Sequence, residues 1–148
     1  MRALIQRTTG ARVQVAGATV GEIGLGFVVL LGITATDTPA LAQKLAQKVA
    51  KLRIFEDENE KLNLALHQVS GECLVISQFT LYGETKSGNR PSFTNAARPD
   101  QAEPIYEAFV AELRQANIPV ATGVFGAMMN VELVNSGPTT IWIDTADW

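Results

Sequence analysis

The sequence is poor in the side chains that most enzymes use for catalysis. Its 148 residues include one cysteine, Cys73, and one histidine, His67. No G-x-S-x-G turn accompanies the histidine, so a Ser-His-Asp hydrolase is not indicated. A P-loop and a dinucleotide-binding fingerprint are missing as well. If the chain is an enzyme, we expect it to work without a metal, without a cofactor and without a side-chain base.

Metal-ligating patterns are equally scarce. Glu56, Asp57 and Glu58 form an acidic cluster, but neither His nor Cys lies nearby in the sequence to complete a ligand set. Adjacent carboxylates in a turn are typical of a solvated surface, so we predict no metal site there. Cys73 lies in an apolar stretch and is expected to be a buried structural thiol. His67 is expected in a surface loop.

Strong net charge and long apolar runs are also lacking. Twelve Lys and Arg oppose fifteen Asp and Glu, a formal net charge of −3, which argues against broad electrostatic adhesion to nucleic acid or membranes. A small basic rim around a site for the end of a nucleic acid remains compatible. No signal peptide pattern and no run near the ~18 residues of a membrane span is visible. One cysteine cannot form an intrachain disulfide. We predict a cytoplasmic single domain over residues 1–148.

What the sequence does contain is a succession of strands with two helices among them. One helix is expected to start at Thr38-Pro39, and another at a capping pair of Asp100 and Glu103, ending before Pro119. A turn or short hairpin is expected at 53–63, and a long loop at 82–97, where Phe93 could dock. Strands are expected at 2–6, 12–16, 19–23, 27–33, 72–79, 119–123, 128–135 and 139–144. This order predicts an α+β fold with a mixed, barrel-like sheet and two main helices packed outside.

The segment Ser77-Gln78-Phe79-Thr80 lies where an apolar strand runs into the long loop. At such a junction main-chain N–H groups can point at a ligand and stabilise an oxyanion. Alternatively, the Ser77 and Thr80 hydroxyls cap the strand end by bonding to their own turn. The sequence leaves both interpretations open.

Gly137-Pro138 interrupts the strand-like stretch VELVNSGPTTIWI. Proline has no N–H for a ladder, and glycine has no side chain to pack, so the pair weakens any strand that it enters. A functional interpretation is a turn that brings backbone close to a ligand. The alternative is a connecting turn with no other role, and the residues do not decide between the two.

Six short motifs follow one another along the chain: MRALIQR at 1–7, RIFEDENEKLN at 53–63, SQFTLYG at 77–83, NRPSF at 89–93, FGAMM at 125–129 and NSGPTT at 135–140. With these motifs in this order, the chain resembles the D-aminoacyl-tRNA deacylase family over nearly its whole length, and the ordered set is far more specific than any one motif. The resemblance implies a homodimer that cleaves the ester joining a D-amino acid to the 3′-terminal adenosine of tRNA.

The resemblance also implies roles for particular residues. Ser77, Gln78 and Leu81 would line the site for the adenosine and the acyl group, and the backbone around Phe79 and Thr80 would hold the oxyanion. The 2′-OH of the terminal ribose would help the attacking water. The Thr80 hydroxyl is a rival nucleophile, although nothing in the sequence would activate it.

A Gly-cis-Pro motif at Gly137 and Pro138 would reach into the partner subunit's site and exclude L-amino acids by steric contact with main chain. Glycyl-tRNA would be accepted, because glycine has no side chain to exclude. Arg7 would brace this turn, or else form a surface salt bridge. Phe125 and Met129 would line the site, or else belong to the core.

Thr139 departs from the valine that is usual in the family, which puts the packing beside Gly-Pro in question. Three alternatives to a D-selective deacylase stay open. One is a family member tuned mainly to glycyl-tRNA, and another is a non-catalytic module that binds the end of tRNA. The third is a general esterase that uses Ser77 or Thr80.

Overall fold

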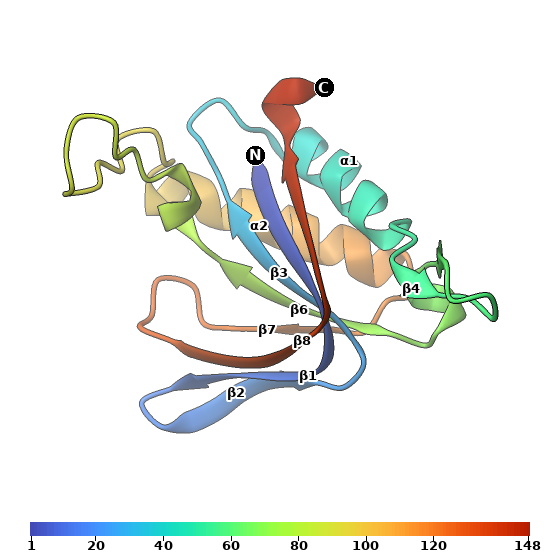
Figure 1. Cartoon of the computed structure of the whole chain (residues 1–148). Helices are drawn as coiled ribbons and strands as arrows, with labels where there is room; N and C mark the ends of the chain where they lie inside the picture. The colour runs from blue at the N-terminus through green and yellow to red at the C-terminus, as the bar shows by residue number, and fades with distance from the viewer.

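The computed structural model describes all residues, 1–148, and shows one curved mixed sheet with both long helices on the same side (Figure 1). The sheet order is β2-β1-β3-β6-β7, and β8 pairs with the other edge of β1. The sheet strands are β1 (Arg2–Val15), β2 (Ala18–Ile23), β3 (Gly26–Gly32), β6 (Glu72–Ser77), β7 (Val120–Thr122) and β8 (Asn130–Asp144). A separate hairpin consists of β4 (Phe55–Glu56) and β5 (Leu62–Leu64). The α+β prediction with a mixed sheet and two helices is confirmed.

The helices are α1 (Pro39–Ala50) and α2 (Pro99–Gln115), with 3-10 turns η1 (Leu66–Gln68), η2 (Phe79–Tyr82) and η3 (Thr145–Asp147). No helix is long and apolar enough to cross a membrane. The main core fills the space between the sheet and the two helices and includes Phe27, Leu45 and Phe109, each fully buried. Parallel β3 and β6 lie at its centre, which explains their continuous apolar sequences.

The structure corrects the number of strands at both ends of the chain. The segments 2–6 and 12–16 belong to one long strand, β1, which pairs with β3 in its first half and with β2 in its second half. The segments 128–135 and 139–144 likewise form one strand, β8. Both long strands curve as the sheet twists. A second, smaller core cluster includes Val13 and Leu74.

The predictions of the two helix starts had different outcomes. For α1 the prediction is confirmed: the Thr38 hydroxyl accepts a hydrogen bond from the Leu41 N–H at 3.2 Å. For α2 the predicted capping pair is wrong, because the helix begins at Pro99 and its N-cap residue, Arg98, makes no side-chain capping bond. Proline has the φ angle that the first helical position needs, and it sets the start ahead of Asp100.

Candidate functional site

Gly137 and Pro138 form an exposed turn that bulges from the middle of β8. The strand pairs Thr140 with Gln6 and Asn135 with Thr8, so residues 136–139 all lie opposite Arg7. The extra residues leave the ladder there, and the Gly137-Pro138 peptide bond is cis, as the resemblance implies. A strand can hold Gly-Pro at this place because neither residue is needed for pairing.

Arg7 braces this turn from inside the protein. It is only 6% exposed, and its Nε donates to the Ser136 carbonyl at 3.2 Å. Its Nη1 donates to the Ile54 carbonyl at 2.9 Å, and its Nη2 donates to Glu56 Oε1 at 3.2 Å. Arg7 is therefore more than the surface salt bridge of the alternative: it connects the β4 strand to the residue before Gly137.

Glycine is required at position 137 by both conformation and space. Its φ is +115°, a value that side-chain-bearing residues rarely adopt. A Cβ added there would lie 2.5 Å from Thr139 Oγ1 and 2.9 Å from Arg7 Nη2. The hydroxyl of Thr139 thus lies against the turn and leaves no room for a side chain at position 137.

Ser77 to Thr80 lie together at the end of β6 and the start of η2. The Gln78 N–H donates to the Leu31 carbonyl at 2.8 Å. Phe79 and Thr80 come first in the 3-10 helix, where the helix provides no acceptor for their N–H groups. Phe79 is 54% exposed. The Thr80 hydroxyl donates to Gln78 Oε1 at 2.7 Å. This bond joins two side chains, and η2 has no side-chain capping bond.

Arg2 holds η2 in place, a role that the sequence did not predict. Its Nη1 donates to the Leu81 carbonyl at 2.8 Å, and its guanidinium lies 4.4 Å from the centre of the Tyr82 ring. Its Nε donates to Asp144 Oδ2 at 2.8 Å, which ties η2 to the end of β8.

The electrostatics of Asp144 follow from this contact. Burial raises the pKa of Asp144, but hydrogen bonds from the Ala146 N–H and from the Arg2 guanidinium lower it by more. The pKa therefore lies below its usual value. Asp144 therefore favours its charged form in the folded protein.

The long loop docks on η2 as its sequence suggested. The Phe93 ring meets Phe79 edge to face, with ring centres 5.1 Å apart and planes at 77°. The loop is closed on itself by a hydrogen bond from the Glu84 N–H to the Ser92 carbonyl at 2.8 Å. Phe79 thus presents an exposed aromatic face with support from one side.

Phe125 and Met129 are half-buried and contact the two core clusters. Phe125 lies 5.9 Å from the Tyr106 ring. Within the single chain both residues support the core, in line with the second interpretation of them.

The residues to which the sequence assigned no catalytic or metal-binding role have structural surroundings that agree with this. Cys73 is fully buried, and burial raises its pKa to about 12, so it is an inert thiol at neutral pH. His67 is exposed in η1. Asp57 caps the β4–β5 turn by accepting from the N–H groups of Asn59 and Lys61. No group of three metal-ligating side chains occurs in the chain.

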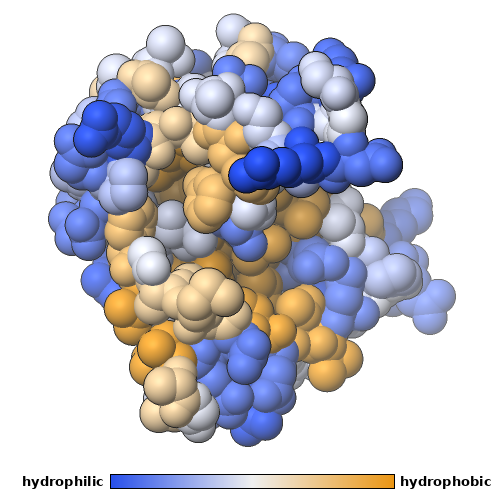
Figure 2. Space-filling model, turned by 90° about the vertical axis from the view of Figure 1, so that its left-hand side faces the viewer, coloured by the Kyte–Doolittle hydropathy of each residue, from blue (hydrophilic) through white to orange (hydrophobic).

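The two predicted motifs do not meet within one chain. Ser77 pairs with Leu31, whose partner in β1 is Ala3, whereas the turn lies opposite Arg7. Four residues along β1 and three strand spacings across the sheet separate them by roughly 15–20 Å. Figure 2 shows the side that is on the left in Figure 1, where apolar surface covers much of the centre and lower part.

A family model described as "D-Tyr-tRNA(Tyr) deacylase" matches residues 4–144. A D-aminoacyl-tRNA deacylase of Chloroflexus aurantiacus is 58% identical over 99% of this chain and 92% of its own length. One of Thermus aquaticus is 56% identical over 99% of this chain and 97% of its own.

Among solved structures, "c-Myc DNA Unwinding Element Binding Protein" superposes with a TM-score of 0.92 at 39% identity, covering 98% of this chain and 99% of that one. A structure titled as a probable eukaryotic D-amino acid tRNA deacylase has a TM-score of 0.80 over 96% of this chain and 97% of that one. At 17% identity, that second likeness concerns the fold alone.

Proposed function

Because this chain belongs to the D-Tyr-tRNA(Tyr) deacylase family, we propose that it hydrolyses the ester of D-aminoacyl-tRNA and releases free D-amino acid and tRNA. The observation that carries the mechanism is the turn at Gly137 and Pro138, exposed at its tip and fixed at its base by a buried arginine. A main-chain element held in this way can act as a rigid selector without any side chain at the point of contact.

The chemical step uses water as the nucleophile. Water attacks the ester carbonyl carbon, the tetrahedral oxyanion forms, and the 3′-oxygen of the terminal ribose leaves and takes a proton. The N–H groups of Phe79 and Thr80 stabilise the oxyanion, and the neighbouring 2′-OH assists the water. One well-placed donor of this kind contributes about 3 kcal/mol to the transition state, which suits an ester that is already activated.

Selection for handedness follows from the Gly137-Pro138 turn. Its backbone carbonyls hold the α-amino group and leave room for a substituent on one side of the substrate Cα. An L side chain would strike main chain that Arg7 prevents from moving. Glycyl-tRNA carries no side chain to exclude, so it is a second substrate.

Two copies of the chain complete the site. The roughly 15–20 Å between the turn and η2 is too far for both to contact one aminoacyl group, so the turn of one protomer serves η2 of its partner. Val134 and Trp142, both on β8, are 62% and 49% exposed, and such apolar surface beside the turn supports a homodimer.

The paired release of D-tyrosine and L-tyrosine from the two tyrosyl-tRNAs tests the proposal. We expect the D-ester to be cleaved at least about 100-fold faster than the L-ester, since rejection by main chain leaves no alternative pose. Glycyl-tRNA is the third substrate in the assay, and a faster rate on it than on the D-ester would favour the glycyl-tuned alternative. Equal rates on the D- and L-esters would refute the selector.

A second candidate is a nucleic-acid-binding protein without deacylase activity. It is favoured by one observation, the name of the solved structure that is 39% identical to this chain. Binding of uncharged tRNA together with no release of any amino acid would support it.

A further inference from the structure

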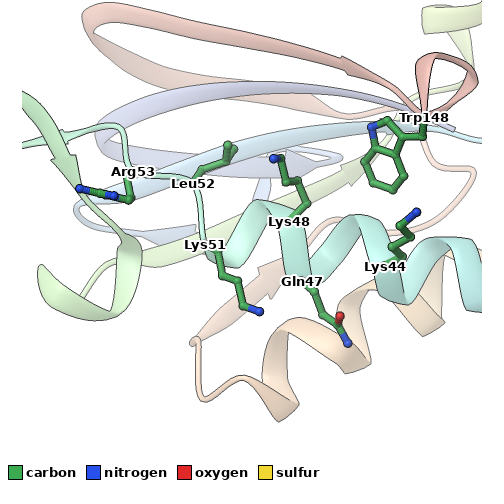
Figure 3. A pocket seen from close by; sticks show the side chains of 7 residues that line it. All are labelled: Lys44, Gln47, Lys48, Lys51, Leu52, Arg53 and Trp148. Carbon is green, nitrogen blue, oxygen red and sulfur yellow. The ribbon is translucent and has the colours of Figure 1, made fainter.

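One cavity of the molecule lies away from both motifs. It has a volume of about 580 Å³ and opens between α1 and the C-terminal residue, Trp148. Lys44 projects from α1 toward the Trp148 ring, Lys48 projects from the same helix, and Arg53 lies beyond the end of the helix (Figure 3). Lys51 also borders the cavity, and no aspartate or glutamate lines it.

This cavity gathers unpaired positive charge in a protein whose net charge is −3. Of the 12 Lys and Arg residues, five form ion pairs: Arg2, Arg7, Arg12, Lys86 and Arg98. Four of the other seven line this cavity. Lys44, Lys48 and Lys51 are exposed and have no carboxylate partner. Since like charges within a turn or two of helix repel one another, this cluster destabilises α1 and is best relieved by a bound anion.

One of the cavity's lysines also contacts the Trp148 ring. The Lys44 Nζ lies 4.8 Å from the centre of the Trp148 ring, a cation–π distance. Arg53 donates from Nε to the Asn63 carbonyl at 2.7 Å, which leaves its other guanidinium N–H groups available. Phosphate oxygens are preferred partners of such groups.

The cavity adjoins the segment that anchors Arg7, the residue beneath the turn. Arg53 precedes Ile54, whose carbonyl accepts a hydrogen bond from Arg7, and Arg7 also holds the Ser136 carbonyl. A nucleic acid with its esterified end at the Gly137-Pro138 turn would therefore pass close to Arg53 and the end of α1.

We propose that this basic cavity binds phosphates of the tRNA stem next to the aminoacylated end, an assignment that rests on the function proposed above. The partner is RNA and not an anionic membrane, because the charges line a concave site in an otherwise acidic protein. The cavity supplies affinity for tRNA, and the two main-chain motifs supply the chemistry.

The test compares Lys44→Gln/Lys48→Gln with a control of equal charge change, Lys61→Gln/Arg114→Gln, whose residues are also exposed but lie outside the cavity. Glutamine preserves helix propensity. Two substrates are used, D-tyrosyl-tRNA and the D-tyrosyl ester of adenosine, which has no stem. Binding of uncharged tRNA is measured in parallel by fluorescence anisotropy over a range of salt concentrations.

For the cavity variant we expect KM for D-tyrosyl-tRNA to rise about 10-fold, with kcat unchanged and cleavage of the adenosine ester unaffected. The slope of log affinity for tRNA against log salt should become shallower by about one for each lysine removed. Equal KM values and equal salt slopes for both variants would overturn the proposal. So would binding of the wild type to phosphatidylserine vesicles with no difference between variants toward tRNA.

The outcomes separate this proposal from the function on which it rests. If the wild-type protein releases no D-tyrosine from either substrate, the deacylase function fails. The anisotropy measurement still decides whether the cavity binds tRNA.

Discussion

The turn at Gly137-Pro138 and the η2 segment are the two main-chain elements to which we assign selection and oxyanion binding, but the protein holds them differently. The turn is held from below by a hydrogen bond from buried Arg7 to the Ser136 carbonyl, and two further hydrogen bonds anchor Arg7 to Ile54 and Glu56. η2 is held from outside by Arg2, which is about one-third exposed, and by the ring of Phe93. A selector has to resist the push of a wrong substrate, whereas an oxyanion site only has to present its N–H groups. We therefore expect substitutions at the turn to have larger effects than those at η2.

The largest effect is expected for Gly137→Ala. The added Cβ would meet Thr139 and Arg7 at less than 3 Å, so the turn must move, and D-tyrosyl-tRNA cleavage should fall about 100-fold or more. Gly17→Ala is the matched control, because Gly17 also has a positive φ, +82°, yet an added Cβ there has no neighbour within 4 Å. Steady-state rates and thermal melting are measured for both variants, so that a loss of activity can be separated from a loss of stability. A similar loss of activity in both would show that the turn has no special role.

Arg7→Met should rank second and affect stability as well as selection. It leaves the Ile54 and Ser136 carbonyls without their donor, at a cost of about 2–4 kcal/mol in the free energy of unfolding. It also frees the turn, so the ratio of D- to L-tyrosyl-tRNA cleavage should fall. Arg12→Met is the control, since Arg12 bridges the same two strands through an exposed pair with Glu132. Urea unfolding and the D/L ratio are measured, and an unchanged ratio for Arg7→Met would contradict the bracing role.

Asp144→Asn tests the outer support of η2 and should have a smaller effect. Because the folded-state pKa of Asp144 is lowered, its charge stabilises the protein above the unfolded-state pKa, about 3.9, and that stability is lost as pH falls through the folded-state pKa. The variant should thus be less stable than the wild type at pH 7, and the difference should shrink toward pH 3. Asp147→Asn, at an exposed position nearby, serves as the control. A difference that is constant with pH would show that the Arg2 contact contributes nothing through charge.

Thr80→Ala should have the smallest effect. The Thr80 hydroxyl bonds to Gln78, and nothing near it activates it as a nucleophile, so kcat should fall less than about 10-fold. Complete loss of activity in a folded variant would instead identify the hydroxyl as the nucleophile. That result would also reverse the comparison between the two sites.

Much of this protein could be predicted from local patterns. Thr38-Pro39 marked the start of α1, and unbroken apolar runs marked the buried strands, because these signals act over a few residues. The start of α2 was a local failure, because Pro99 begins the helix ahead of Asp100. The other predictions failed where a distant contact decides. The long strands β1 and β8 looked like separate pieces, since their mutual pairing runs through a bulge at Arg7. The role of Arg2 was missed because its partners, Leu81 and Asp144, are 79 and 142 residues away.

The sequence alone determined the scarcity of reactive side chains, the order of helices and strands, and the presence of Gly-Pro within a strand-like stretch. Only the tertiary structure decided how that Gly-Pro is held. Arg7 is buried beneath it with three acceptors from two different parts of the chain, and a lone guanidinium cannot be buried unless such partners are provided. Local sequence cannot specify partners that the folded sheet brings together, so the fixed turn is a property of the whole fold.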